Sequence, residues 1–348
     1  MKSLSLKRRT TLLALAAAAA GSMAGSALAQ ESVTLRLHQM LPPQATIPAR
    51  ALVPWAQKVE AESGGRIKVQ LFHAMQLGGA PPQLFDQARD GVVDLTWTVL
   101  GYTPGRFPKT EVFELPFLTT TGEASSRALQ EYVEKFAADE FRSVKLIAVH
   151  THGPGLFHTK TPVTGLESLR GMKIRGGSRI INNMLTKLGA TPIGMPVPAV
   201  TESLSKGVID GTTIPWEVVP PLKVHELVKN HTTFAGANGL YNSTFAFSMN
   251  RGAYDKLPAD LKKVIDDNSG IETAAMFGRA MDDGDKVGRE IAVKAGNNIV
   301  ALDVAETQRW RRTAATVEAD WIAEVKGKNI DGAKLAAEAR ALVAKHSR

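Results

Sequence analysis

The stretch that decides the fold is residues 166–216, LESLRGMKIRGGSRIINNMLTKLGATPIGMPVPAVTESLSKGVIDGTTIPW. Its pattern predicts one α/β unit built around a single arginine. Met172–Arg175 is a short strand, and Gly176-Gly177 ends it. Ser178 is a good N-cap for a helix that runs from Arg179 to Leu188.

Arg175 therefore lies at the carboxyl end of a strand, beside a glycine turn and a helix N-terminus. Ligands of open α/β sheets bind at this edge. A guanidinium group holds a carboxylate by two parallel hydrogen bonds, so the position predicts an anion site. The alternative is an arginine that pairs with a neighbouring acid or lies on the surface.

The same stretch carries a family resemblance. The run LRGMKIRGGS, followed by LGATPIGMPVPAVTESLSKGVIDGTTIPWE, resembles the substrate-binding proteins of TRAP transporters, the DctP type. FHAMQLGG, DGVVDLTWTVLGY and FELPFL upstream and MNRGAYDKLPADLKKVI downstream extend it over nearly the whole chain after its leader. The resemblance implies a two-lobed α/β periplasmic binding-protein fold of type II-like topology, with a ligand cleft between the lobes and a long bridging helix.

The first 29 residues have the form of a secretory signal peptide. A basic start with Lys2, Lys7 and Arg8-Arg9 precedes the apolar run 12–20, and Ala27-Leu28-Ala29 is a cleavage site. We expect cleavage after Ala29 and a periplasmic protein. The arginine pair leaves both the twin-arginine and the general secretory routes open.

The leader holds four of the 42 Lys and Arg residues, which leaves 38 against 34 acids in the remaining 319 residues, a net charge of +4. This mild excess lacks the dense basic run of a nucleic-acid site. The chain has no cysteine, which excludes disulfides, thiolate metal sites and a cysteine nucleophile.

Strands alternate with helices from residue 33 onward, which indicates a parallel, layered sheet. Together with the resemblance, this predicts five segments. They are a signal peptide (1–29), the first part of lobe I (30–152), the main part of lobe II (153–241), a return to lobe I (242–281), and the bridging helix, lobe II edge and C-terminal helices (282–348).

The segment Asp260–Ala295 has few helix breakers and forms either one long helix or two. Gly270, Gly278, Gly284 and Gly288 each cost roughly 1 kcal/mol inside a helix, and we expect them to permit bending.

His150, His152 and His158 raise a metal hypothesis, because two histidines at alternate strand positions present both rings on one face. A zinc enzyme needs a third ligand from His158 or an acid such as Glu217. The spacing matches no zinc signature, and Gly153-Pro154-Gly155 is typical of a crossover between domains. We therefore expect His152 and Phe157 to face the cleft or brace the hinge, with no metal and no cofactor.

The chain departs from the family pattern at two site positions. Other members carry a second substrate arginine near Gly155 and an asparagine just before Pro215, whereas this chain has glycine and Ile214 there. We expect Trp216 and Phe157 to form an apolar wall, which favours a monocarboxylate with an apolar or aromatic body. The alternative for Trp216 is a place in the core.

Other side chains complete the predicted site. Tyr102 follows a strand end and offers a ring face and a hydroxyl, or is an ordinary half-buried tyrosine. Glu217, His152 and Asn242 offer polar contacts. The sequence lacks G-x-S-x-G and H-E-x-x-H, so we expect a binding protein and no enzyme.

The expected partners are a small-molecule carboxylate and, by resemblance, one small and one large TRAP membrane subunit driven by an ion gradient. An ABC-type or sensor-linked binding protein is the alternative, and a zinc enzyme is the second. We expect a monomer or a homodimer.

Overall fold

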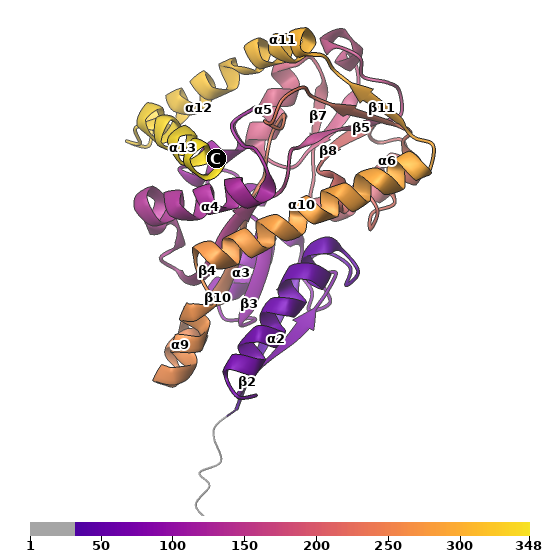
Figure 1. Ribbon diagram of the computed structural model, residues 1–348. Helices are drawn as coiled ribbons and strands as arrows, with labels where there is room; N and C mark the ends of the chain where they lie inside the picture. The colour runs from indigo at the N-terminus through magenta and orange to yellow at the C-terminus, as the bar shows by residue number, and fades with distance from the viewer. Residues whose placement is uncertain (1–31) are drawn as a thin grey trace, which may run out of the picture.

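The computed structural model describes residues 32–348, so the expected signal peptide lies outside the described residues. This part of the chain folds into two β-sheets, each covered by helices. One long helix, α10 (Ile271–Lys294), runs obliquely from one sheet to the other (Figure 1). The two-lobed α/β fold is therefore confirmed.

The first sheet has five strands in the order β2-β1-β3-β10-β4. Strands β1, β2 and β3 are parallel, and β10 runs antiparallel between β3 and β4. The bounds are β1 (Val33–Gln39), β2 (Ile67–Phe72), β3 (Leu95–Val99), β10 (Thr244–Asn250) and β4 (Val144–Thr151).

The second sheet has six strands in the order β11-β9-β5-β8-β6-β7. Strand β5 runs antiparallel to both β8 and β9, and the other neighbours are parallel. The bounds are β11 (Asn298–Ala301), β9 (Asn230–Thr233), β5 (Leu156–Thr159), β8 (Gly211–Ile214), β6 (Lys173–Gly176) and β7 (Thr191–Gly194).

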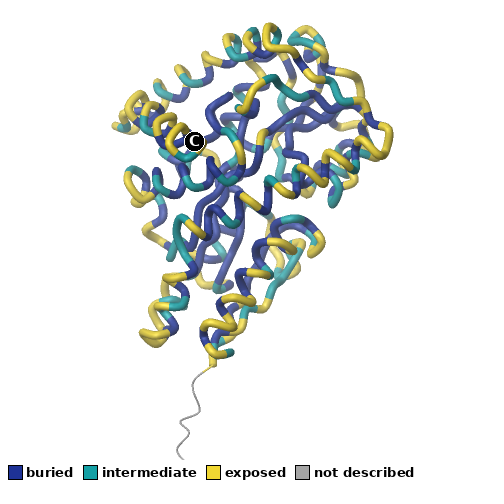
Figure 2. Tube along the Cα trace, in the orientation of Figure 1, coloured by how far each residue is buried: buried dark blue, intermediate teal, exposed yellow. Residues whose placement is uncertain are grey.

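Helices cover the outer faces of both sheets, and Figure 2 shows their exposed sides around the buried strands. The bounds are α2 (Val53–Glu62), α3 (Leu84–Arg89), α4 (Gly122–Tyr132), α5 (Arg179–Lys187), α6 (Val200–Ser205), α7 (Val224–Leu227), α8 (Arg251–Asp255), α9 (Ala259–Asp267), α11 (Val304–Ala314), α12 (Thr316–Lys326) and α13 (Gly332–His346). The last three arch over the second sheet and return to α4 (Figure 1).

Two strands of the second sheet differ from the sequence expectation. The sequence pattern assigned no strand to Leu156–Thr159 and none to Gly211–Ile214, which form β5 and β8. Every residue of both strands is buried. A strand buried on both faces lacks the polar–apolar alternation by which a strand is found in a sequence.

The bridging region consists of two helices, α9 and α10, separated at Gly270, which has a φ of +81°. The glycines inside α10 mark close packing. A Cβ at Gly278 would lie 2.3 Å from the Gly122 carbonyl oxygen, and one at Gly288 would lie 2.1 Å from the Trp216 carbonyl oxygen. The glycines thus let the helix approach backbone from both halves of the molecule.

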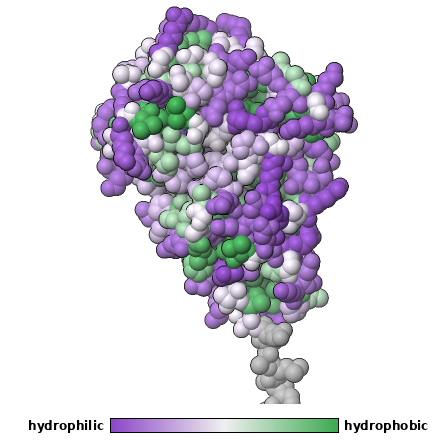
Figure 3. Space-filling view, turned by 180° about the vertical axis from the view of Figure 1, so that it is seen from behind, coloured by the Kyte–Doolittle hydropathy of each residue, from purple (hydrophilic) through white to green (hydrophobic). Residues whose placement is uncertain are grey.

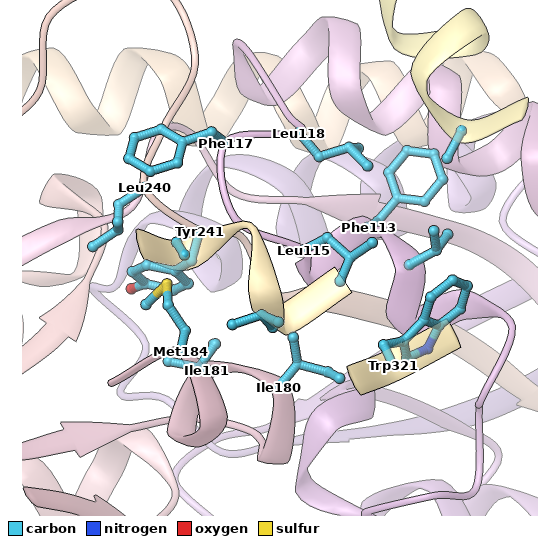
Figure 4. Packing of buried hydrophobic residues seen from close by; sticks show 14 of the residues in the cluster. Phe113, Leu115, Phe117, Leu118, Ile180, Ile181, Met184, Leu240, Tyr241 and Trp321 are labelled. Atoms are coloured by element: carbon cyan, nitrogen blue, oxygen red, sulfur yellow. The ribbon is translucent and has the colours of Figure 1, made fainter. Parts of the chain in front are cut away.

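The connection after β3 is part of the core. Phe113 and Leu115 pack in one apolar layer with Ile180 of α5 and Trp321 of α12 (Figure 4). This layer ties the C-terminal helices to the segment that leads into α4.

No helix within residues 32–348 combines the length and apolarity that a membrane crossing needs. Seen from behind, hydrophobic residues form separate patches among hydrophilic ones (Figure 3).

Candidate functional site

A cavity lies between the two sheets, at the carboxyl ends of β3 and β6. The empty space between its walls is about 440 Å³ when the open mouth is counted. The first sheet contributes Trp97, Val99 and Phe245, and the second contributes Arg175 and Thr213. The remaining lining residues are Met40, Leu41, Tyr102, His152, Gly177, Val197, Ile214, Pro215, Glu217, Val218, Tyr241 and Ser243.

Arg175 is the cationic group of the cavity. It extends from β6 and is only 4 % exposed. Its Nε donates to the Met195 carbonyl at 2.9 Å, and one terminal nitrogen donates to the Thr213 carbonyl at 3.0 Å. None of the ion pairs formed within residues 32–348 includes Arg175. A buried charge without a counter-ion is costly, so this guanidinium favours an anion beside it.

Gly177 keeps one edge of that guanidinium open. A Cβ at this position would lie 3.0 Å from the second terminal nitrogen of Arg175. The glycine that ends β6 therefore shapes the turn and also leaves room for a ligand oxygen at the fork.

Aromatic rings form one wall of the cavity. Trp97 and Phe245 stack with centroids 5.2 Å apart and planes 9° apart. His150 also stacks on Phe245, at 4.8 Å, and accepts a 2.8 Å hydrogen bond from the Trp97 indole. Burial lowers the pKa of His150 to about 3, which keeps it neutral in this role. The stack offers a rigid flat face to a ligand ring.

His152 presents an unpartnered nitrogen. Its Nδ1 bonds the Gly153 carbonyl, and its Nε2 is buried without a hydrogen-bond partner. Burial, opposed by the Gly153 bond and reinforced by the Arg175 charge, lowers the pKa of His152 to about 4. The neutral ring donates through Nδ1, so Nε2 is an acceptor.

Asn242 acts on the cavity through His152. Its side chain accepts from the His152 amide at 3.1 Å and donates to the His152 carbonyl at 2.9 Å. It also donates to the Thr119 hydroxyl at 3.0 Å and does not line the cavity. The amide therefore fixes the backbone from which His152 projects.

Glu217 lines the cavity and is 5 % exposed. Its Oε2 is buried with no hydrogen-bond partner. Burial raises the pKa of Glu217 to about 7, against a smaller lowering by the Thr46 hydroxyl. The carboxyl group can therefore be neutral or ionised near pH 7.

Two contacts hold the halves of the molecule together at the rim. Tyr102 follows β3, and its hydroxyl accepts a hydrogen bond from the Val197 amide at 2.8 Å. The Arg179 Nε, at the start of α5, donates to Glu111 at 2.7 Å. The cavity is thus in a closed arrangement.

Phe157 and Trp216 lie outside the cavity lining. Phe157 is fully buried and packs edge-on against Trp310 at 5.6 Å. Trp216 packs on His158 and His231 and borders a separate hollow beside α10. The aromatic wall comes from the first sheet instead, because Trp97 of β3 and Phe245 of β10 line the cavity.

Sequence reasoning missed Tyr241, Trp97 and Phe245. Tyr241 accounts for the unusual glycine at 155, because a Cβ there would lie 2.4 Å from the tyrosine ring. The ring occupies the space that a side chain at 155 would take. The glycine at 155 was the sign in the sequence that another group fills this space. That this group is Tyr241 could not be found without the fold.

The three histidines of the zinc hypothesis lie in different surroundings. His150 stacks within the first sheet, whereas His158 belongs to the second sheet and bonds His231 at 2.6 Å. Residues 32–348 contain no group of three His, Cys, Asp or Glu side chains arranged to hold a metal ion.

Comparison with known proteins gives a family match. The family described as bacterial extracellular solute-binding protein, family 7 (DctP) matches residues 38–324. This match favours the TRAP type over the ABC-type or sensor-linked alternative.

The solved structures similar to this chain include three in complex with aromatic acids. A TRAP solute-binding protein from Rhodoferax ferrireducens, in complex with copurified benzoate, is 48 % identical, with a TM-score of 0.89 over 91 % of this chain and 99 % of that one. A marine metagenome protein specific for aromatic acids, with 3-hydroxybenzoate, is 47 % identical, with a TM-score of 0.90 over 92 % and 100 %. A periplasmic protein from Bordetella bronchiseptica, with bound mandelate, is 33 % identical, with a TM-score of 0.83 over 90 % and 99 %.

Proposed function

This chain belongs to family 7 of the bacterial extracellular solute-binding proteins, the binding subunits of TRAP transporters, and we propose that it captures an aromatic monocarboxylate. The ligand would enter the cavity between the two sheets outside the cytoplasm. The chain would then deliver it to the TRAP membrane subunits.

The observation that carries the proposal is the guanidinium of Arg175, which is buried at the end of an aromatic cavity and forms no ion pair within the described residues. Its two carbonyl bonds fix the plane of the fork before a ligand arrives. A carboxylate at the open edge would supply the missing charge, with hydrogen bonds that contribute roughly 1.5–3 kcal/mol each.

The rest of the lining supports an aromatic body. Trp97, Phe245 and Tyr241 provide ring faces, and Val197 and Ile214 provide aliphatic contacts. With glycine at 155, the chain has no second arginine there for a second carboxylate. The similar structures described with benzoate, 3-hydroxybenzoate and mandelate are consistent with this ligand class.

Isothermal titration calorimetry on ligand-stripped protein tests the proposal. We expect benzoate and mandelate to bind, and neutral benzamide and the dicarboxylate succinate to bind at least a hundredfold more weakly. Arg175→Met should abolish acid binding while the circular dichroism spectrum stays that of the wild type. Equal binding of benzamide and benzoate would overturn the proposal.

The remaining expectations concern export and assembly. We propose a leader that ends at Ala29, which predicts Gln30 as the first residue of the exported protein. N-terminal sequencing checks the cleavage site, and export in a strain without the twin-arginine translocase separates the two routes. Light scattering distinguishes a monomer from a homodimer.

A further inference from the structure

Glu217 has a carboxyl oxygen, Oε2, that takes no part in the proposed binding of the ligand carboxylate by Arg175. Its Oε2 is buried without a partner, yet the side chain lines the cavity. Its own backbone is held from two sides: the amide donates to Asp285 of α10 at 2.8 Å, and the carbonyl accepts from Thr46 at 3.3 Å. The backbone of Glu217 is thus held in place, and its carboxyl oxygen Oε2 is left without a partner.

Glu217 lies apart from Arg175 in the cavity lining, because the Arg175 charge shifts the pKa of His152 but is not among the causes that shift the pKa of Glu217. Tyr102 and Gly177, at the Arg175 end, also border a hollow in front of α5. Glu217 also borders a different hollow, between Thr46 and α10. Both side chains line one cavity, so a molecule held by Arg175 can reach Glu217 with its other end.

We propose that Glu217 binds a hydroxyl group at the end of the ligand remote from its carboxylate, so that the preferred ligand is a hydroxylated aromatic monocarboxylate. This inference rests on the proposed function. An ionised carboxyl accepts the hydroxyl proton, and a protonated one donates to the hydroxyl oxygen, so either form supplies the missing hydrogen bond.

A ligand without that hydroxyl leaves Oε2 buried and unpaired. The cost of this unpaired oxygen is the larger part of the difference in affinity between ligands with and without the hydroxyl. A site that hydrogen-bonds a ligand hydroxyl strongly rejects an analogue that lacks this hydroxyl. An apolar pocket rejects a ligand with an added hydroxyl less strongly. His152 is the other free acceptor, but its pKa responds to the Arg175 charge, which places its ring near the carboxylate end. A hydroxyl read by His152 would therefore be adjacent to the carboxylate.

The positional isomers of hydroxybenzoate separate these cases in calorimetric titrations. We expect 3- or 4-hydroxybenzoate to bind about tenfold more tightly than benzoate, as one buried hydrogen bond to a carboxyl group implies. The matching methoxybenzoate, which has no proton to donate, should lose this advantage if the carboxyl group is the acceptor. In Glu217→Leu the hydroxyl advantage should fall below twofold, and in Glu217→Gln, which keeps a polar group, part of it should remain.

Glu202→Gln is the matched control, because Glu202 is an exposed glutamate on α6 that pairs with Lys206. It should keep the wild-type preference. The inference is overturned if the wild type binds benzoate and the hydroxybenzoates equally, if the advantage survives in Glu217→Leu, or if only 2-hydroxybenzoate gains. Failure of every acid to bind would instead overturn the proposed function, so the two results are distinguishable.

Discussion

Asp282 and Asp285, three residues apart on α10, bind backbone amides from different parts of the fold. Asp282 accepts from Gly122 at 2.6 Å and from Glu123 at 2.9 Å, at the start of α4 beside the first sheet. Asp285 accepts from Glu217 at 2.8 Å, on the chain that leaves the second sheet. The bridging helix therefore holds both halves by directional hydrogen bonds as well as by packing.

Asp282→Ala should destabilise the protein by about 2 kcal/mol, because two helix-start amides lose their acceptor. Urea denaturation measures the change. Asp283→Ala is the control, since Asp283 pairs only with exposed Lys286 and should change the free energy of unfolding by under about 0.5 kcal/mol. Equal effects from both variants would contradict the capping role.

Gly288→Ala should also destabilise the protein. Alanine favours helices by about 1 kcal/mol over glycine, but its Cβ would lie 2.1 Å from the Trp216 carbonyl oxygen. We expect overpacking to outweigh the helical gain, for a net loss of about 2 kcal/mol. Thermal unfolding checks this, with exposed Val293→Ala on the same helix as the control. A Gly288→Ala protein with a raised melting temperature would show that the helix can move away.

Much of the fold could be predicted because its local signals are strong. The alternating run Val33–Gln39 is β1 in full, and the serine cap places the start of α5 at Arg179. Ser178 accepts from the Ile181 amide at 3.2 Å, as that cap requires. Strand β5 could not be found, because four buried residues carry no alternation.

The site was less predictable than the fold. Arg175 could be proposed from the sequence because its position at a strand end and the chemistry of its guanidinium group both favour an anion site, and in the structure it lines the cavity. Trp97 and Phe245 could not be found, because they belong to antiparallel neighbours β3 and β10 and meet only when the sheet forms. Trp216 and Phe157 were chosen as aromatic residues next to the two positions that depart from the family pattern, and neither criterion distinguishes a cavity wall from the core behind it.

Tyr102→Phe should speed ligand release. The substitution removes the acceptor of the Val197 amide and leaves a buried N–H unpaired in the closed arrangement. We expect an affinity about tenfold weaker, mostly through faster dissociation, because most affinity changes within one complex appear in the off-rate. Stopped-flow competition with benzoate measures the off-rate. The control is Tyr254→Phe, a half-buried tyrosine outside the cavity whose hydroxyl donates to Asp266. An unchanged off-rate would rule out this bond as a latch.

Arg175→Lys should lose most of the affinity although it keeps the charge. An ammonium group cannot donate to Met195 and Thr213 and also present a fork to a carboxylate. We expect benzoate to bind at least tenfold more weakly, measured by calorimetry. An affinity within threefold of wild type would mean that charge alone suffices and that the fork is dispensable.

Glu217→Gln should change how stability depends on pH. Burial raises the pKa of Glu217 from 4.5 to about 7 in the folded protein. The folded protein therefore favours the protonated form of Glu217. The contribution of this form to the free energy of unfolding is complete below pH 4.5 and is lost as the pH rises through 7. Glutamine has no proton to lose, so the ligand-free variant should gain about 3 kcal/mol over the wild type between pH 4.5 and pH 8. Burial also raises the pKa of Glu114 and Glu140, and these effects cancel because both proteins contain the groups. Burial and the Glu217 charge raise the pKa of Asp285, so the substitution relieves Asp285 as well and adds to the gain at high pH. Urea denaturation across this range measures it, and a difference that stays constant with pH would mean that Glu217 is ionised throughout.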